Sequence, residues 1–256
     1  MKKIVILTGA TGGVGREFLK QVLKEEIDEV WAIARSEQKL SELQKEHGER
    51  VIPISIDLSD MEGIEQIESI LEKNKPHVEY LINNAGLAKM GKYDDFSIAE
   101  IDKTINVNCK APVMLARICI PYMGKGSKIL NISSASAFQP NPYINLYAAS
   151  KAFERSYSRA LNVELEGTGI TSIAVCPSWI DTELLQKEIN GKKVKFPGLV
   201  TADRVVKQAI KDAKKGKDMS VCSLYVKCQH MNVKLLPQRW IMKRWMAGIG
   251  KYLEEN

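Results

Sequence analysis

The sequence predicts a single-domain α/β protein with a doubly wound parallel sheet of about seven strands and helices on both faces of that sheet. Three observations predict this class. Short apolar runs alternate with segments of helical periodicity, the first apolar run leads into a glycine-rich turn, and 45% of the 256 residues are hydrophobic. Each helix in such an alternation returns the chain to the edge where the next parallel strand begins. A chain of this length buries one large core, so one domain is expected over residues 1–256.

The first strand is expected at residues 3–8, where the run KIVIL is apolar and rich in β-branched side chains. A glycine-rich turn follows at 8–15, and a helix is expected over 13–25, with Phe18 and Val22 at helical spacing. Strand, glycine turn and helix in this order are typical of a dinucleotide-binding turn. The glycines let the backbone approach a pyrophosphate, and the amino end of the helix favours its negative charge. The alternative is a tight turn without a ligand.

The later elements repeat the alternation. Further strands are expected near 29–34, 51–56, 79–83, 128–133, 171–176 and 219–223. Further helices are expected near 36–47, 60–73, 97–122, 145–167 and 201–215. In a doubly wound sheet, the ligand crevice lies at the carboxyl ends of the strands.

The end of the second strand indicates which cofactor is bound. An acidic residue there would bind the ribose 2′-hydroxyl of NAD, but Ala34, Arg35 and Ser36 occupy this position. A guanidinium pairs well with phosphate oxygens, and Ser36 can both cap the next helix and donate to the same group. We therefore expect NADP(H). The alternative is that Arg35 packs over the adenine without contacting a phosphate.

Tyr147 and Lys151 lie four residues apart in the run YAASK, downstream of Ser134. In a helix the two side chains share one face. An ammonium beside a phenol favours the phenolate, so the phenol can donate and accept a proton near neutral pH. The hydroxyl of Ser134 can bond a substrate oxygen opposite the phenol. The alternative is a packed tyrosine beside a solvated lysine.

These motifs resemble, in order, those of the short-chain dehydrogenase/reductase family, whose members have a Rossmann-type fold. The run Thr8-Gly9-x-x-x-Gly13-x-Gly15 resembles the family's cofactor turn, and Asn83-Asn84-Ala85-Gly86 resembles its NNAG strand end. The turn also fits TGxxGxxG, which is typical of the extended branch of the family. The NNAG run and the chain length of 256 residues favour the short branch.

The resemblance continues to residue 182. Asn108, Ser134, Tyr147 and Lys151 resemble the catalytic tetrad, and the segment 176–182 resembles the family's PGxxxT segment with Ser178 in place of the usual Gly. The resemblance implies that Tyr147 transfers the proton on oxygen, that Lys151 assists it and binds the nicotinamide ribose, and that Asn108 positions a water. Residues 183–256 carry no family motif.

The resemblance also implies the residues around each ligand. The cofactor is expected to contact Gly9, Thr11, Gly12, Gly13, Val14, Gly15, Arg35, Ser36, Asp57, Leu58, Asn84, Ala85, Gly86, Tyr147, Lys151, Pro177, Ile180 and Thr182. The substrate pocket is expected to include Ser134, Ser136, Tyr143, Trp179, Leu184 and Leu185, with Phe138 beside them. The expected divisions are a cofactor-binding and catalytic core at 1–182, a substrate lid at 183–200 and a variable basic segment at 219–256.

The expected activity is an NADP(H)-dependent transfer of hydride between nicotinamide and the carbonyl or alcohol carbon of a hydrophobic ketone or secondary alcohol, hydroxysteroids among them. One alternative is a 3-ketoacyl reductase that acts on acyl-carrier or CoA thioesters. Another is a nucleotide-binding sensor without turnover, but a sensor needs no proton relay of the kind that Tyr147 and Lys151 form.

Cysteine usage and hydropathy indicate the cellular compartment and exclude some classes of site. The five cysteines include no CxxC pair, which favours the cytoplasm over a disulfide-forming compartment. Cys222, Cys228 and His230 lie close together, but a zinc site needs a fourth ligand, and we expect no metal. No apolar run approaches the length of a membrane span, and we expect no nucleic-acid partner.

The charge is concentrated near the carboxyl end. Residues 207–251 carry eleven Lys or Arg and two Asp, although the net charge of the chain is only +6. Met242, Trp245, Met246 and Ile249 fall on one helical face, with Arg239 and Lys243 on another. Packing on the protein's own body is favoured; the alternatives are that this face lines a substrate pocket, docks on a neighbouring subunit or touches a membrane surface. A homodimer or homotetramer is expected through the helices at 97–122 and 145–167.

Overall fold

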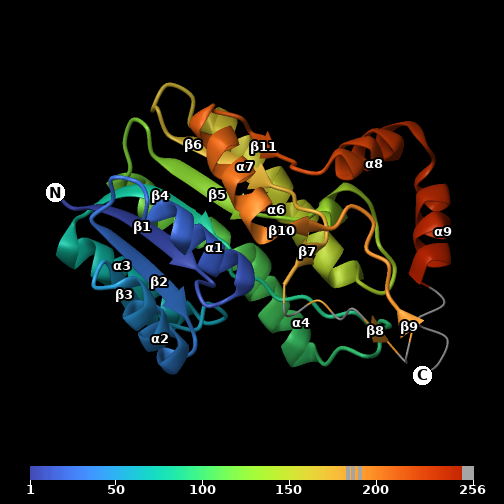
Figure 1. Cartoon of the computed structure of the whole chain (residues 1–256), viewed down its shortest axis with the longest axis horizontal. Coiled ribbons are helices and arrows are strands. Elements are labelled where there is room, and N and C mark those ends of the chain that lie inside the picture. Colours follow the sequence, from blue (N-terminus) through green and yellow to red (C-terminus); the bar gives the residue numbers. More distant parts are fainter. Residues whose placement is uncertain (183–184, 186–187, 190–191, 250–256) are drawn as a thin grey trace.

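The computed structural model describes residues 1–182, 185, 188–189 and 192–249. Seven parallel strands form one sheet in the order β11-β6-β5-β4-β1-β2-β3 (Figure 1). The strands are β1 (Lys3–Thr8), β2 (Glu29–Ala34), β3 (Val51–Ser55), β4 (His77–Asn83), β5 (Lys128–Ile132), β6 (Thr171–Val175) and β11 (Met219–Ser220). The order reverses between β1 and β4, as the doubly wound prediction requires, so the fold class is confirmed.

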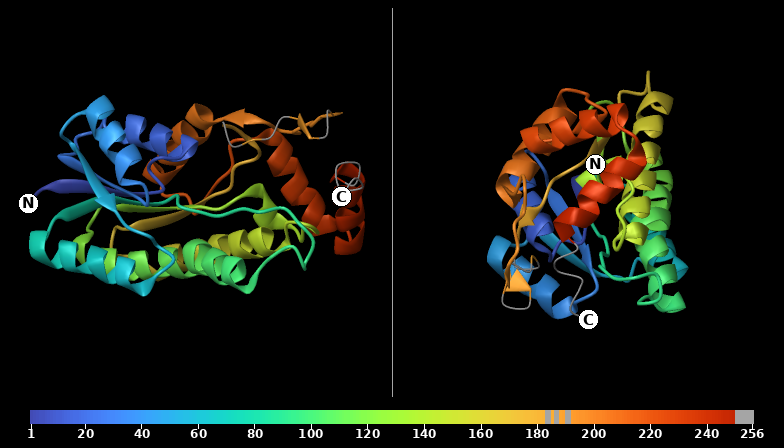
Figure 2. Two further views of the ribbon diagram at one scale, coloured as in Figure 1. Left: turned by 90° about the horizontal axis from the view of Figure 1, so that it is seen from below. Right: turned by 90° about the vertical axis from the view of Figure 1, so that its right-hand side faces the viewer.

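Helices cover both faces of the sheet (Figure 2). One layer contains α1 (Gly13–Val22), α2 (Glu37–His47) and α7 (Ala202–Lys214). The other contains α3 (Met61–Asn74), α4 (Ile98–Ile105), α5 (Ala111–Cys119) and α6 (Asn145–Glu164). Alternate residues of β1 enter the two cores: Val5 and Leu7 face the first layer, and Ile4 and Ile6 face the second. Burial on both faces explains why the strands are continuous apolar runs.

The helix expected over 97–122 is interrupted. A π-helical turn, η1 (Asn106–Lys110), separates α4 from α5, and a short 3-10 turn, η2 (Ile120–Tyr122), ends the segment. Pro112 lies just after η1 and has no N–H to continue the α-helical ladder. Isolated π-helical turns inside helices are frequent at functional sites, and this one contains Asn108.

A buried polar ladder crosses the middle of the sheet. Asn83 at the end of β4 donates to Asn131 of β5 (2.8 Å), and Asn131 donates to the hydroxyl of Ser172 on β6 (3.4 Å). The Ser172 hydroxyl in turn lies 3.0 Å from that of Ser158 on α6. The ladder therefore ties α6 to three neighbouring strands.

Short elements follow β6. Strand β7 (Ile180–Asp181) pairs with β10 (Val200–Thr201), and β8 (Glu188–Ile189) pairs with β9 (Lys192–Lys193) in a hairpin. A 3-10 turn, η3 (Ala135–Phe138), follows β5.

Two helices end the described chain, α8 (Leu224–Leu235) and α9 (Gln238–Ile249). Pro237 separates them, and Leu236 has the extended backbone that a residue before proline prefers (φ −105°, ψ 149°). Figures 1 and 2 show the pair at one end of the longest axis of the molecule, opposite the amino terminus. None of the described helices has both the length and the apolar content that crossing a bilayer would demand.

Candidate active site

The glycine turn and the NNAG run meet where the strand order reverses. The side-chain amide of Asn84 donates to the carbonyls of Thr8 (3.0 Å) and Gly9 (3.1 Å). The Thr8 hydroxyl accepts from the backbone N–H groups of Asn84 (2.9 Å) and Ala85 (3.0 Å). Two motifs more than 70 residues apart in sequence therefore form one rigid wall at the carboxyl edge of the sheet.

The turn before α1 has room only for glycine at its critical points. A Cβ on Gly9, whose φ is +62°, would lie 2.9 Å from the Cα of Ala85, and a Cβ on Gly15 would lie 2.2 Å from the Gly9 carbonyl oxygen. A Cβ on Gly13 would lie 2.9 Å from Cγ2 of Thr182, so the segment after β6 approaches the same turn.

The amino end of α1 suits an anionic group. Its N-cap, Gly12, offers no side-chain cap, and the first turn contains no acidic residue. By contrast, α2, α4 and α7 are capped by the hydroxyls of Ser36, Ser97 and Thr201. The first N–H groups of α1 are thus available to phosphate oxygens, so the structure fits a dinucleotide pyrophosphate.

Arg35 lies at the carboxyl end of β2, where the sequence predicted it. Its side chain is exposed, and its guanidinium forms no ion pair with another residue in the described part of the chain. Ser36 caps α2 by accepting from the Lys39 N–H (3.3 Å), as expected. The Arg35 guanidinium is therefore free to bind a phosphate at this edge.

Asp57 and Leu58 follow β3. The carboxylate of Asp57 accepts from the backbone and hydroxyl of Ser59 (3.0 and 2.8 Å) and from Lys103 (3.0 Å). Leu58 is buried in the second core. The Asp57 carboxylate is thus already bonded within the chain, and a contact of Asp57 with adenine stays a prediction.

The two catalytic hydroxyls expected from the sequence come from different elements. Ser134 follows β5 and accepts from the Ser136 N–H (3.1 Å), so its own O–H proton remains free to donate. Tyr147 lies in the first turn of α6 and is half-buried, and its hydroxyl bonds no residue that the structure describes. Both hydroxyls are available to a ligand.

Lys151 lies one turn after Tyr147 on α6, and the predicted shared face is confirmed. Its side chain is only 5% exposed, and its ammonium lies 5.9 Å from the centre of the Tyr147 ring. The ammonium donates to the Ile132 carbonyl (2.7 Å) and to Glu154 (2.8 Å). A Cβ on Gly86 would lie 3.3 Å from this nitrogen, so Gly86 keeps the approach to Lys151 open.

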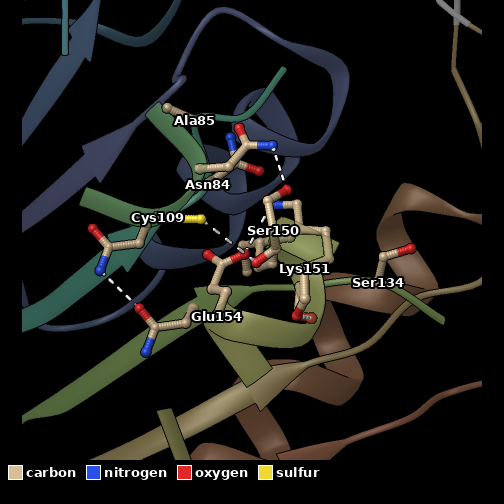
Figure 3. A network of polar contacts seen from close by, with 12 residues as sticks. Asn84, Ala85, Cys109, Ser134, Ser150, Lys151 and Glu154 are labelled. Carbon is tan, nitrogen blue, oxygen red and sulfur yellow. Dashed lines mark hydrogen bonds and ion pairs between the residues drawn. The ribbon is translucent and has the colours of Figure 1, made fainter. Parts of the chain in front are cut away.

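Glu154 is a site residue that the sequence reasoning missed. It lies on α6 and pairs with Lys151 at 2.8 Å, with only 1% of its side chain exposed (Figure 3). Its second carboxylate oxygen has no hydrogen-bond partner among the described residues. Burial raises the pKa of Glu154 to about 7, against the lowering effect of the Lys151 ammonium. The signal was the i,i+3 spacing from Lys151, which puts the two side chains on one face.

Asn108 lies in η1 and is completely buried. Its amide oxygen accepts from the Leu87 N–H (2.8 Å), and its amide nitrogen donates to the Leu87 carbonyl (2.8 Å) and the Ser150 hydroxyl (3.0 Å). In an α-helix the Asn108 carbonyl would accept from residue 112, but Pro112 has no N–H. The side chain therefore links η1 to α6 through Ser150 and to the segment after β4 through Leu87, and Pro112 withholds the usual partner of the Asn108 carbonyl.

The segment after β6 lies beside both ligand regions. The Pro177 carbonyl accepts from the Ala135 N–H (2.8 Å) next to Ser134, and Ile180 packs against the first core. The Trp179 ring lies 5.2 Å from that of Phe196. Leu185 is half-buried, and its N–H donates to the Thr182 carbonyl (3.0 Å), whereas Leu184 lies outside the described residues.

The segment between Ser134 and Tyr147 contains one strained residue. Tyr143 has a φ of +66°, in the left-handed region that non-glycine residues seldom adopt, and its carbonyl accepts from the Gly91 N–H (2.8 Å). Phe138 was expected beside the substrate, but its side chain is buried. Its ring centre lies 4.1 Å from that of His230 and 5.0 Å from Cζ of Arg155. Phe138 therefore supports the segment from behind and does not line an open pocket.

Comparison with known proteins gives consistent results. A family model described as short chain dehydrogenase matches residues 3–193. An uncharacterized oxidoreductase of Staphylococcus epidermidis is 27% identical over 207 residues, which are 80% of this chain and 90% of that protein. The very-long-chain 3-oxoacyl-CoA reductase of Anas platyrhynchos is 34% identical over 192 residues, which are 70% of this chain and 60% of that protein. A short-chain dehydrogenase from Sphingobium yanoikuyae, solved with NADPH, superposes with a TM-score of 0.77 at 26% identity and covers 93% of this chain and 95% of that one.

Proposed function

The chain belongs to the short-chain dehydrogenase family and is an oxidoreductase, and from this premise we propose that it transfers hydride between NADP(H) and a hydrophobic ketone or secondary alcohol. The observation that carries the proposal is that Lys151, one turn after Tyr147, donates to the Ile132 carbonyl at the end of β5, two residues before Ser134, while α1 nearby has an uncapped amino end.

The residues present fit NADP(H). The free N–H groups of α1 would hold the pyrophosphate, and Arg35 with Ser36 would hold the 2′-phosphate of the adenosine ribose. The solved Sphingobium relative contains NADPH. Gly86 and Lys151 would contact the nicotinamide ribose, since Gly86 has no side chain to cover the ammonium.

Bound nicotinamide would supply or accept the hydride at the carbonyl carbon, and the protein would manage the proton. Ser134 would donate a hydrogen bond from its O–H to the substrate oxygen and orient it, while keeping its own proton. Tyr147 gives a proton to that oxygen during reduction and takes it back during oxidation. The Lys151 ammonium stabilises the phenolate that Tyr147 forms, and the Asn108 carbonyl would hold a water that returns the proton from solvent.

Half-buried apolar side chains support a hydrophobic substrate. Tyr143, Trp179 and Leu185 are all partly exposed and come from the two segments that flank the catalytic hydroxyls. Hydroxysteroids fit this description. The Anas relative, named for very-long-chain 3-oxoacyl-CoA, supports 3-ketoacyl thioesters as the second candidate. A panel of ketones, alcohols and 3-ketoacyl thioesters with NADPH and NADH would distinguish them.

Tyr147→Phe tests the proton transfer. Phenylalanine preserves the ring and deletes the transferable proton, so turnover should fall by about 10²–10⁴-fold while NADPH binding is retained. Turnover is followed by absorbance of reduced nicotinamide, and NADPH binding by its fluorescence. Tyr157→Phe is the matched control, because Tyr157 is also on α6 and instead stacks on Phe153 (6.3 Å). Full activity in Tyr147→Phe would contradict the mechanism, and no turnover in the wild type would favour the sensor.

We also propose a homo-oligomer in a reducing cytoplasm. The helices α4 and α6 expose the apolar side chains of Ile105, Phe153 and Val163, which suits burial against a second copy. All five cysteines are free thiols. Sedimentation velocity would measure the subunit number, and a monomer would contradict the proposal.

A further inference from the structure

The inner face of the α8–α9 pair packs on the chain segment 138–142, which lies between the catalytic serine and tyrosine. Three contacts join them: Gln229 with Gln139 (3.0 Å), the ring of His230 with that of Phe138 (4.1 Å), and the Trp245 indole N–H with the Pro142 carbonyl (2.9 Å). The pair is therefore a fixed part of the wall beside the active site.

The outer face of α8 is apolar. Val226 is buried and His230 packs on the body, which defines the inner face. The opposite side carries an exposed stripe at i, i+4, i+7 and i+11: Leu224, Cys228, Met231 and Leu235. Leu224 and Leu235 are 74% and 76% exposed. A continuous exposed apolar stripe of this kind marks an interaction surface.

The same helix pair is positively charged, and no acidic side chain within it balances that charge. Residues 224–249 contain no Asp or Glu. Five exposed cations lie in this stretch, and none forms an ion pair with a described residue: Lys227, Lys234, Arg239, Lys243 and Arg244. The neighbouring α7 differs, because its Lys207 pairs with Asp203 (2.8 Å).

An exposed aromatic residue follows the stripe. Trp240, in the first turn of α9, is 67% exposed, and Leu236 before it is also exposed. Tryptophan and leucine beside basic residues are typical of helices that lie in the headgroup region of a bilayer. Figures 1 and 2 show α8 and α9 at one end of the molecule, where the β8–β9 hairpin also lies, so a flat surface can approach the pair from that end.

We propose that the outer face of α8–α9 docks on an anionic lipid bilayer. The stripe enters the headgroup boundary, and the five cations neutralise anionic headgroups. A symmetric contact with a second copy would oppose five unpaired cations to five more, so the charge disfavours it. The face of α9 for which the sequence favoured packing on the body is half-buried, and its Trp245 bonds the Pro142 carbonyl. The surface proposed for docking is a different one, the exposed side of α8 with Trp240.

Docking has a consequence for the active site. The inner face of α8–α9 holds the segment that includes Pro142, next to Tyr143. A docked molecule would therefore keep the substrate side of its active site close to the lipid, where hydrophobic ketones concentrate. The docking itself involves no catalytic residue, so its test is independent of the proposed activity.

Flotation of the full chain with vesicles tests the proposal. The protein should float with vesicles of phosphatidylcholine and phosphatidylglycerol, much less with phosphatidylcholine alone, and salt should release it. Trp240 emission should shift to shorter wavelength on binding, and the Trp240→Phe variant should lose most of that shift.

Two variants separate the apolar and electrostatic contributions. Met231→Ser with Leu235→Ser removes the carboxyl-terminal half of the stripe, and Lys227→Gln, Lys234→Gln and Lys243→Gln together remove three cations. Each cation near an anionic surface contributes enough that losing three should weaken partition about a hundredfold. Matched exposed controls on other elements are Ile98→Ser and Lys211→Gln with Lys215→Gln. All these side chains are exposed, so the variants should fold, and circular dichroism checks this.

The proposal is overturned if wild type does not float, if it floats equally with neutral vesicles, or if both α8–α9 variants float like the controls. A fall in oligomer mass in Met231→Ser with Leu235→Ser, without any vesicle binding by wild type, would instead identify this face as a subunit contact.

Discussion

Replacing Glu154 with Gln should change how stability depends on pH. The folded state raises the pKa of Glu154 from 4.5 to about 7, because its carboxyl is buried and only partly compensated by Lys151. A group with a raised pKa stabilises the fold below its unfolded pKa and loses this contribution as pH rises through its folded pKa. At about 1.36 kcal/mol per pKa unit, the contribution lost between about pH 4.5 and pH 7 is about 3 kcal/mol.

The groups around Glu154 keep their charge states in this pH range, so the pH dependence of the free energy of unfolding comes from Glu154. Lys151 on the same helix has a pKa raised by Glu154 and Tyr147 against the opposing effect of burial, so it stays charged throughout this range. Cys109 in η1 and Cys176 after β6 both have pKa values raised by burial, and both stay neutral. Titrating groups that do not interact with Glu154 are common to wild type and variant and cancel in the difference.

Urea unfolding at a series of pH values between about 5 and about 8 measures the effect. The free energy of unfolding of wild type should fall relative to Glu154→Gln as pH rises, by up to about 3 kcal/mol. Glu164→Gln, an exposed glutamate on the same helix, should run parallel to wild type. A difference between wild type and Glu154→Gln that does not vary with pH would refute the reasoning.

Two further predictions concern residues that are expected to contact the cofactor. Arg35→Ala should weaken NADPH binding about ten- to a hundredfold and leave NADH nearly unchanged in fluorescence titrations, since a charge-assisted phosphate contact contributes about 1.5–3 kcal/mol; equal losses would mean that Arg35 does not contact the 2′-phosphate. Gly15→Ala should destabilise the protein by about 1–3 kcal/mol in denaturant, because its Cβ would lie 2.2 Å from the Gly9 carbonyl oxygen. Gly12→Ala, whose Cβ would lie 3.5 Å from that atom, should cost much less, and equal effects would contradict the steric argument.

The strands and the glycine turn could be predicted because their causes are local. Burial on both faces requires an apolar run such as that of β1, and Gly9 and Gly15 are required by the backbone path of the turn itself. Tyr147 and Lys151 were found for the same reason, since helical spacing alone puts them on one face.

The rest depends on contacts between distant segments. Glu154 has the polarity of a surface residue, and only the packing of α6 against η1 and the sheet buries it. The burial of Asn108 involves side-chain bonds to Leu87, which is 21 residues away. The outward face of α8 could not be predicted either, because its inner face is defined by a contact with Phe138, which the sequence assigned to the substrate pocket.

The polar ladder through Asn83, Asn131, Ser172 and Ser158 affects how the enzyme meets its ligands. Ser158 lies two turns after Lys151 on α6, so the ladder fixes the rotation of that helix about its own axis. A helix turned to another setting would leave buried amides and hydroxyls without partners, which is costly. The orientation of Tyr147 and Lys151 is therefore set during folding, before any ligand binds. Binding then needs little ordering of the catalytic groups, and affinity is not reduced by that entropy.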